Sequence, residues 1–337
     1  MELYGAVADD YLDFASYADG DSPTFADWAR GVAADPQVVA WIAGLPPIKQ
    51  QPNLVFAAAR WHGVPAPGPY AALREALLRD DGRLRATILA RSTQTNEVGR
   101  LATLVPAFGL LEGPLALLEV GASAGLTLYP DRWGYAWLTA DGPVTLGSES
   151  PRLSCEVQGP APLPIRLPEV AWRGGIDLNP LDVTDDDAMA WLTTLVWPEH
   201  DDRRARLQQA IEVARTDPPT IARGDLLERL PDLVEQAASY APDATLVVFH
   251  SAVIAYLEDA DRRRFARTMA GLVESGRCHW VSNEGPRVLP EVTGTTAVPP
   301  GRFVLGLDGR PLAVTHGHGR SMVWVEPVAD VSSRAAR

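Results

Sequence analysis

Residues 115–128, Leu-Ala-Leu-Leu-Glu-Val-Gly-Ala-Ser-Ala-Gly-Leu-Thr-Leu, constrain the fold of this chain more than any other stretch. The apolar run Leu115–Val120 predicts a buried strand, and the small residues 121–125 predict a sharp turn into a helix. Such a turn presents backbone N–H groups and the positive end of a helix dipole to a ligand with no side chain in between. The sequence therefore predicts a ligand-binding loop directly after this strand.

The loop fits two motifs that predict different chemistry. As Gly-x-Ser-x-Gly it is a nucleophile elbow, with Ser123 as the attacking hydroxyl of a serine hydrolase. As Glu-x-Gly-x-Ser-x-Gly it is a relaxed nucleotide-cofactor loop, in which Ser123 replaces the middle glycine. The hydrolase would need a distant aspartate and His279 or His316 as partners of Ser123. A non-catalytic ligand-binding protein on the same fold is a third possibility.

The order of the predicted elements favours the cofactor loop. Residues 1–112 predict a helical N-terminal cap region, whose last helix spans 93–108. Residues 113–330 alternate strands with helices, which predicts an α/β, Rossmann-like, mostly parallel sheet with an antiparallel C-terminal edge. A hydrolase elbow follows several strands and an upstream oxyanion loop, whereas a nucleotide-cofactor loop follows the first strand. Here the glycine-containing turn follows the first predicted strand.

Polar residues stand at the carboxyl ends of the later predicted strands. They are Asp177, Asp225, the pair His250-Ser251 and the pair Asn283-Glu284. Ligands of open α/β sheets bind outside the carboxyl ends of the strands, near the point where the strand order reverses. These residues are therefore candidates for the functional site.

The pattern of Glu119-x-Gly121, Asp177, Gly224-Asp225 and Val247-Val248-Phe249-His250 resembles the Rossmann-like S-adenosylmethionine-dependent methyltransferases. The resemblance implies methyl transfer from S-adenosylmethionine to a small molecule. It also implies that the acid after the second strand holds the ribose hydroxyls and that the acid after the third lies near the adenine. The cofactor-binding residues that it implies are Glu119, Gly121, Ala122, Ser123, Gly125, Asp177 and Asp225.

Two positions could supply the ribose-binding acid. Asp141 has the better spacing for a dinucleotide-binding fold, about twenty residues after the loop, but lies in a Gly-Pro turn context. Asp177 stands at a predicted strand end that enters a helix cap. We predict Asp177, which makes residues 130–168 an insertion.

At closer range, five blocks spread over nearly the whole chain resemble an uncharacterised bacterial family. It is common in actinobacteria and is known as domain-of-unknown-function family 2332. The blocks are residues 52–54, 91–100, 118–126, 175–182 and 282–285. This resemblance implies no assigned reaction.

The other candidate residues have structural interpretations as well. His250 and Glu97 are predicted as catalytic, although a histidine at a strand end is as often a structural hydrogen-bonding group. Asn96, Glu97 and Arg100 share one face of the predicted helix 93–108; they could form a surface ion pair, but a polar cluster in an apolar helix favours a functional role. The predicted substrate-binding residues are Asn96, Arg100, Ser251, Asn283 and Glu284.

Composition narrows the class of partner. The 337 residues carry a formal net charge of −13, which disfavours binding to a phosphate backbone. Cys155 and Cys278 are too few for a disulfide framework or a zinc ribbon. His316 and His318 could face the same way, but with no third ligand a glycine-rich turn is the better interpretation, so no metal is predicted. With no signal peptide or membrane-length apolar stretch, we expect a cytoplasmic protein that acts on a small molecule, with no nucleic-acid or membrane partner.

Overall fold

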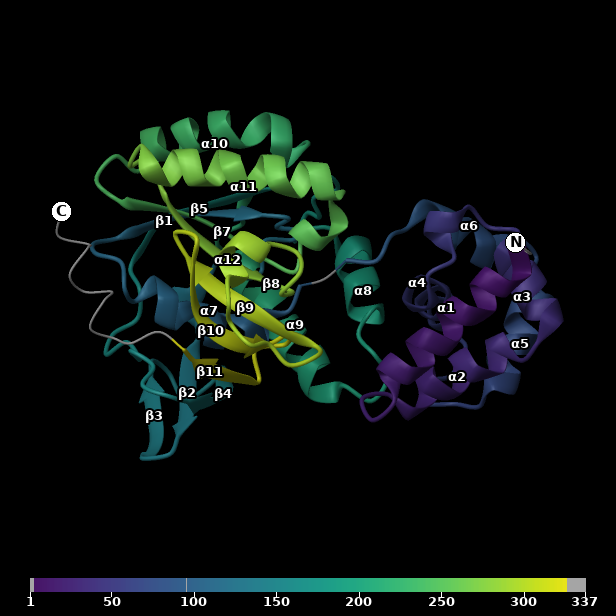
Figure 1. Cartoon of the computed structure of the whole chain (residues 1–337). Coiled ribbons are helices and arrows are strands. Elements are labelled where there is room, and N and C mark those ends of the chain that lie inside the picture. The colour runs from purple at the N-terminus through teal and green to yellow at the C-terminus, as the bar shows by residue number, and fades with distance from the viewer. Residues whose placement is uncertain (1–2, 95, 326–337) are drawn as a thin grey trace. The chain divides into compact units, whose positions relative to one another are not determined.

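The computed structural model describes residues 3–94 and 96–325 and divides into two compact units (Figure 1). Residues up to 95 together with 184–208 form the first unit, and residues 96–183 together with those from 209 onward form the second. This division differs from the predicted boundary near residue 112. The difference arises because residues 96–112 include α7 (Leu101–Phe108), which packs on strands of the sheet.

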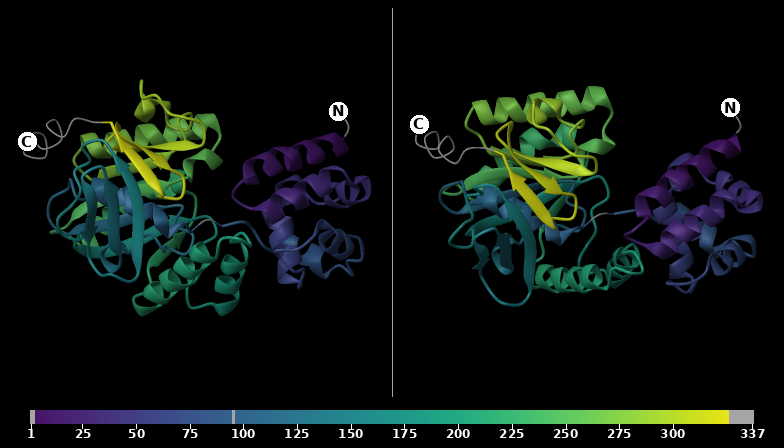
Figure 2. Two further views of the ribbon diagram at one scale, coloured as in Figure 1. Left: turned by 90° about the horizontal axis from the view of Figure 1, so that it is seen from below. Right: turned by 60° about the horizontal axis from the view of Figure 1, so that its bottom comes forward.

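The first unit is helical and has an aromatic core. The ring centroid of Phe56 lies 5.1 Å from that of Phe25 and 5.4 Å from that of Trp28. The side chains of Ser22 and Asp35 cap two of its helices, each followed by a proline in the first turn. Figure 2 shows the N-terminal helices, in purple and blue, gathered in one helical body. The helices are α1 (Leu3–Ala18), α2 (Pro23–Ala33), α3 (Pro36–Ala43), η1 (Pro47–Lys49), α4 (Pro52–Trp61), α5 (Tyr70–Leu78), α6 (Arg83–Ala90) and α8 (Asp186–Thr194).

The second unit is built on one 11-stranded sheet. Its strands are β1 (Leu115–Val120), β2 (Gly134–Thr139), β3 (Gly142–Leu146), β4 (Arg152–Gln158), β5 (Val170–Asp177), β6 (Thr220–Arg223), β7 (Thr245–Ser251), β8 (His279–Glu284), β9 (Arg302–Leu307), β10 (Arg310–His316) and β11 (Ser321–Trp324). The helices along these residues are η2 (Val98–Arg100), α7, η3 (Pro130–Arg132), α10 (Leu226–Tyr240), η4 (Ile254–Tyr256), α11 (Asp259–Glu274) and α12 (Pro290–Thr293), and α9 (Asp201–Thr216) spans the division.

The central part of the sheet is parallel. The full strand order is β3-β2-β4-β11-β10-β9-β8-β7-β1-β5-β6, and β6, β5, β1, β7 and β8 all run in the same direction. Numbered among themselves, these five strands have the order 3-2-1-4-5 of doubly wound nucleotide-binding folds. The prediction of an α/β fold with a mostly parallel sheet is confirmed. The order reverses between β1 and β7, so the carboxyl ends of these two strands mark the switch point at which such sheets bind ligands.

The C-terminal strands β9 and β11 both run antiparallel to β10, which lies between them, and the sheet continues beyond β11. The continuation is β4, β2 and β3, which come from the predicted insertion between β1 and β5. Because β9 is antiparallel to both β8 and β10, β10 runs in the direction of β8 and β1. The turn after β10 therefore reaches the same edge of the sheet as the carboxyl end of β1.

The two faces of the parallel strands are covered by different helices. Figure 1 shows α10 and α11 side by side over one face. On that face, Trp280 of β8 packs on Phe265 of α11 with ring centroids 6.1 Å apart. On the other face, Phe249 of β7 packs on Phe108 of α7 with centroids 5.5 Å apart.

Side-chain alternation distributes the polar strand-end residues between these two faces. Glu119 of β1 lies beside Phe249 of β7 in the sheet. Phe249 in turn lies beside Val281 of β8, two residues before Asn283. Glu119, Ser251 and Asn283 therefore share the face of Phe249. His250 and Glu284 lie on the opposite face, toward α11. The candidates thus form two groups rather than one.

The predicted helix after the loop is wrong. Residues 121–133, all of which are described, form turns and the short η3 before the chain enters β2. Residues 122–130 are all buried, so no polar side remains for a helix at the surface. No helix dipole in this segment therefore points at a ligand.

The predicted helix 93–108 starts later than expected. Residues 93, 94, 96 and 97 are not helical, and the regular helix begins only at Leu101. Glu97 precedes η2 and accepts a hydrogen bond from the N–H of Gly99 (3.1 Å), as a capping residue does. Asn96, Glu97 and Arg100 therefore do not share a helix face, and each makes its own contacts.

Gly319 allows the turn after β10 to touch η2 backbone to backbone. A Cβ at Gly319 (φ +73°) would lie 2.0 Å from the carbonyl oxygen of Gly99, whereas a Cβ at Gly309 (φ +79°) would meet nothing within 4 Å. We expect Gly309→Ala to show only the backbone cost of about 1–2 kcal/mol. Gly319→Ala should lower the free energy of unfolding by several kcal/mol more, measured by urea denaturation of both variants. Equal losses would contradict the close contact.

Candidate functional site

The loop after β1 is held by the end of the neighbouring strand β5. Oδ2 of Asp177, the last residue of β5, accepts a hydrogen bond from the N–H of Ser123 (2.9 Å). Its Oδ1 accepts one from the N–H of Asn179 (2.7 Å). An ionised carboxylate has about four acceptor positions. Asp177 therefore fixes the loop and keeps acceptor capacity for the hydroxyls of a ligand.

The loop glycines are needed for packing within the chain. The N–H groups of Gly121 and Ala122 donate to the carbonyl of Ile176 (2.8 and 3.1 Å). A Cβ at Gly121 (φ +69°) would lie 2.4 Å from the side chain of Val253, and a Cβ at Gly125 (φ +67°) would lie 2.8 Å from a proline ring. A substitution at either glycine would disturb the loop itself, so it cannot isolate a role in ligand binding.

Asn96 holds the same loop from the other side. Its Nδ2 donates to Oγ of Ser123 (2.8 Å), and its Oδ1 accepts from the N–H of Ala124 (3.3 Å). Ser123 has a left-handed backbone (φ +52°), which is uncommon outside glycine and concentrates at functional sites. Asn96, predicted to bind substrate, is thus a support of the loop.

The histidines that a serine hydrolase would use make other contacts. His279 is the first residue of β8, at the amino end, and its Nδ1 lies 2.7 Å from Oδ2 of Asp308. This hydrogen bond raises the pKa of His279. Nδ1 of His316 accepts from the N–H of His318 (3.0 Å), and its Nε2 lies 3.3 Å from Arg320. This geometry does not favour Ser123 as a nucleophile.

Glu119 is a buried carboxyl group at the end of the central strand, with 8% of its surface exposed. The hydroxyl of Thr127 donates to Oε1, whereas Oε2 has no hydrogen-bond partner among the described residues. Burial raises the pKa of Glu119 to about 8, although the Thr127 hydrogen bond and the positive charge of Arg100 lower it. At neutral pH the group is therefore protonated. A cation placed beside Oε2 would favour its ionised form.

Arg100 joins three segments at the carboxyl edge. Only 7% of its surface is exposed. Its Nε donates to the carbonyl of Gly317 and its Nη1 to the carbonyl of Ser251, both at 2.8 Å. The guanidinium carbon lies 6.0 Å from the ring centroid of Phe303. Arg100, predicted to bind substrate, therefore fixes η2, the end of β7 and the turn after β10 relative to one another.

Ser251 and Asn283 belong to a hydrogen-bond chain across the strand ends. Nδ2 of Asn283 donates to Oγ of Ser251 (2.9 Å), and the hydroxyl of Thr315 donates to Oδ1 of Asn283 (2.7 Å). Asn283 and Thr315 are fully buried. The chain links β7, β8 and β10 on the face of Glu119. Ala252, next in sequence, has a left-handed backbone (φ +57°), a second strained residue at this edge.

His250 is fully buried against α11. Its Nδ1 lies 2.8 Å from Oε1 of Glu284, and its Nε2 accepts a hydrogen bond from the indole of Trp280 (3.0 Å). Oε1 of Glu284 also accepts hydrogen bonds from the N–H groups of Val253 and Ile254, after β7. The ring centroid of Phe265 lies 5.2 Å away. Because both nitrogens of His250 are engaged, this geometry favours a structural role for His250 over the predicted role of catalytic base. It likewise favours a structural role for Glu284 over the predicted role in substrate binding.

The remaining acids lie at different edges. Asp225 follows β6 and caps α10 by accepting a hydrogen bond from the N–H of Leu227 (2.8 Å), so it stays at the carboxyl edge. Asp141 lies in the turn between β2 and β3. β2 runs opposite to β1, since it is parallel to β4 and through β4 to β11. Of the two acids considered for ribose binding, only Asp177 lies beside the loop.

Sequence reasoning missed Thr127, Thr315 and the role of His318. Thr127 and Thr315 reach their partners from turns and strands that no local pattern connects to Glu119 or Asn283. Nδ1 of His318 lies 3.2 Å from Oε2 of Glu97, the other predicted catalytic residue. The signal for His318 is the neighbouring Gly319, which allows a close backbone approach to Gly99.

Neither a metal-binding cluster nor a membrane-spanning helix is found in the part of the chain that the structure describes. Within residues 3–94 and 96–325, no group of three or more His, Cys, Asp or Glu side chains is arranged to hold a metal ion. None of the described helices is long and apolar enough to cross a membrane.

Glu119→Gln should change how stability depends on pH. The ordinary glutamate pKa is 4.5, and the folded protein raises it to about 8. Between these values the folded state holds more protons than the unfolded state, so the wild type loses stability as pH rises, and the loss is complete above about pH 8. Relative to the wild type, the variant should gain roughly 2–4 kcal/mol between about pH 5 and about pH 9.

Urea denaturation across this pH range measures the difference. Asp141→Asn, which removes an exposed carboxylate at the opposite edge, controls for the change in net charge. A difference between Glu119→Gln and the wild type that stays constant with pH would show that Glu119 ionises normally.

Comparison with known proteins identifies the family. A search of curated proteins found no match. A family model described as "Uncharacterized protein conserved in bacteria (DUF2332)" matches residues 62–324. The match includes every strand of the sheet and all the residues at its carboxyl edge discussed above. The chain therefore belongs to this bacterial family, as the resemblance of its sequence blocks predicted.

Proposed function

We propose that this protein binds S-adenosylmethionine at the carboxyl ends of β1 and β5 and transfers its methyl group to a small molecule. The observation that carries the proposal is the unpartnered, buried Oε2 of Glu119 at the switch point of the sheet. An unsatisfied buried acceptor costs folding free energy, so its retention suits a ligand donor. The ammonium or sulfonium group of S-adenosylmethionine is a cation of the required kind.

The charges at this edge favour a cationic ligand over a phosphate-bearing one. Glu119, Asp177 and Asp225 stand at or just after the ends of the adjacent strands β1, β5 and β6. Asp177 and Asp225, together with Glu119 once it has given up its proton, attract a cation and repel a pyrophosphate. In addition, residues 121–133 provide no helix N-terminus, which is what holds the pyrophosphate in dinucleotide-binding folds. The residues present therefore fit S-adenosylmethionine better than NAD.

The side chains at the edge would divide the work of binding. Asp177 accepts hydrogen bonds from the ribose hydroxyls with the lone pairs that the loop leaves over, and Asp225 lies one strand further on. Glu119 gives up its proton and pairs with the positive charge. Asn96 and Arg100 keep the loop and η2 in place. The bound cofactor supplies an activated methyl group, and the chain contributes mainly by orienting the acceptor toward it.

Isothermal titration calorimetry with Glu119→Gln, Asp177→Asn and Asp141→Asn tests this assignment. We expect S-adenosylmethionine to bind the wild type and NAD not to bind. Glu119→Gln removes the charge that pairs with the ligand. Asp177→Asn leaves a ribose hydroxyl unpaired and also turns an amide N–H toward a loop N–H, so affinity should fall by about 10- to 100-fold in each variant. Asp141→Asn removes the same charge at the opposite edge and should bind like the wild type. No binding to the wild type, or equal binding to all three variants, would refute the proposal.

A fluorophosphonate probe separates this function from serine hydrolysis. Ser123 is held by Asn96 and Asp177 and should remain unlabelled, with Ser123→Ala still binding S-adenosylmethionine. The probe would label an activated serine. Labelling of the wild type that disappears in Ser123→Ala would establish a hydrolase instead.

A further inference from the structure

A carboxylate and an imidazole meet beside the loop, on the face of Glu119. Glu97 is 5% exposed, and its Oε1 accepts a hydrogen bond from the N–H of Gly99 (3.1 Å). Its Oε2 lies 3.2 Å from Nδ1 of His318. The two atoms are within ion-pair distance, although the ring is not aligned for a hydrogen bond. Such contacts in catalytic pairs are often loose and tighten when the substrate binds.

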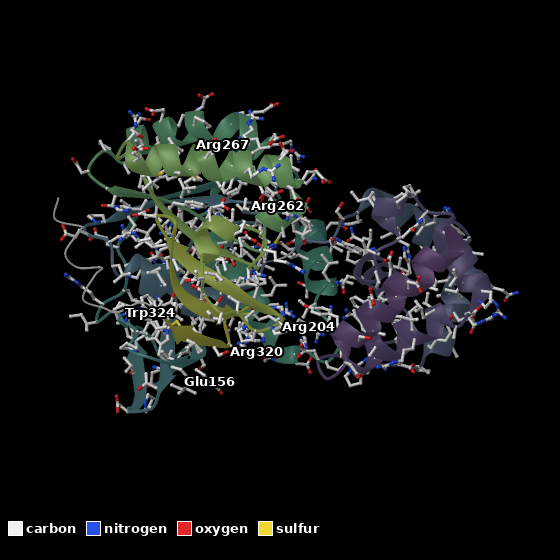
Figure 3. The ribbon with its side chains drawn as sticks, in the orientation of Figure 1. Glu156, Arg204, Arg262, Arg267, Arg320 and Trp324 are labelled. Carbon is white, nitrogen blue, oxygen red and sulfur yellow. The ribbon has the colours of Figure 1, made fainter. Side chains whose placement is uncertain are left out.

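The turn that carries His318 is held by backbone contacts at the residues before and after it. Arg100 donates to the carbonyl of Gly317, and Gly319 lies in backbone contact with Gly99. Arg320, labelled in Figure 3, ends the turn directly before β11. Both anchors belong to η2, the segment that Glu97 caps. The position of His318 relative to Glu97 is therefore set by the backbone on both sides.

The outer nitrogen of His318 is available. Nε2 forms no hydrogen bond within residues 3–94 and 96–325, and 24% of the side chain is exposed. Asn96, adjacent to Glu97, is bound to Ser123 of the loop. The pair thus lies next to the segment assigned to the cofactor. His250, by contrast, has both nitrogens engaged in the core.

We propose that His318, oriented by Glu97, is the general base that takes a proton from the acceptor. The proposal rests on the proposed function and adds that the acceptor carries an O–H or N–H group. That bond breaks, its proton goes to Nε2, and its electron pair forms the new bond to the methyl carbon, while sulfur keeps the electrons of the bond that breaks. Glu97 then stabilises the imidazolium. Arg100 and His316 contact the turn that carries His318, and Arg320 lies 3.3 Å from Nε2 of His316.

Reactivity toward diethyl pyrocarbonate, which acylates unprotonated and accessible imidazole nitrogens, tests the pair without an acceptor. Mass spectrometry locates the modified histidines. We expect His318 to react faster than the buried His250, and its rate to fall by about tenfold or more in Glu97→Gln, because Glu97 holds the ring proton on Nδ1 and leaves the Nε2 lone pair for acylation, whereas a glutamine N–H facing Nδ1 would move the proton to Nε2. Glutamine keeps the oxygen that accepts from Gly99, so η2 should stay folded, as a thermal melt checks. The rate at the exposed His62, in the first unit, is the internal control.

The tautomer of His318 gives a second readout, which a merely structural histidine would not show. In 15N-histidine-labelled protein, with the signal assigned from His318→Gln, the neutral ring should carry its proton on Nδ1, facing Glu97, and lose this preference in Glu97→Gln. A proton on Nε2, or acylation of His318 at the same rate in both proteins, would overturn the proposal.

Turnover measurements test the role of His318 in methyl transfer. Small phenols, alcohols and amines are screened with S-adenosylmethionine, and for any that is methylated, His318→Gln should lower kcat by about 10²- to 10⁴-fold with the cofactor Kd unchanged. Retained kcat would refute His318 as base and leave the proposed function standing. Absence of S-adenosylmethionine binding to the wild type would refute the proposed function, and the tautomer and acylation results would still report on the pair.

Discussion

The buried guanidinium of Arg100 is the interaction on which the arrangement of the carboxyl edge depends. Its hydrogen bonds to the carbonyls of Ser251 and Gly317 connect η2, the end of β7 and the turn after β10. These segments are far apart in sequence, and the Gly99–Gly319 contact brings two of them to backbone distance. With η2 fixed, Asn96 reaches the loop after β1 and Glu97 reaches His318. One cation in a buried position thus connects the segments that carry Asn96, Glu97 and His318.

The edge is divided by the pleat of the sheet. Glu119, Ser251 and Asn283 share one face, and each has a polar or charged neighbour from another segment. His250 and Glu284 face α11, where an indole and aromatic rings enclose them. A residue at a strand end can therefore stand at the right edge and still face away from the ligand.

The parallel part of the fold and the acids at the strand ends could be predicted from the sequence, because both depend on local patterns. The apolar run before Gly121 and the position of Asp177 follow from alternation and from turn residues. The helix expected after the loop does not form, since residues 122–130 are all buried and leave no polar side. The helix expected over 93–108 begins only at Leu101, because Asn96 and Glu97 contact residues that are far away in sequence. Neither the Asn96–Ser123 contact nor the Glu97–His318 contact leaves a mark in local periodicity.

Glu119 should lose its proton when it receives a cationic cofactor. Its pKa is raised to about 8 by burial, so at pH 7 the carboxyl group is mostly protonated before binding. Calorimetry of S-adenosylmethionine binding in buffers with different ionisation enthalpies counts the protons released. At pH 7 the wild type should release close to one proton more than Glu119→Gln, and the difference should vanish at about pH 9, where Glu119 is already ionised. Binding with the same proton count in both proteins at pH 7 would contradict the account.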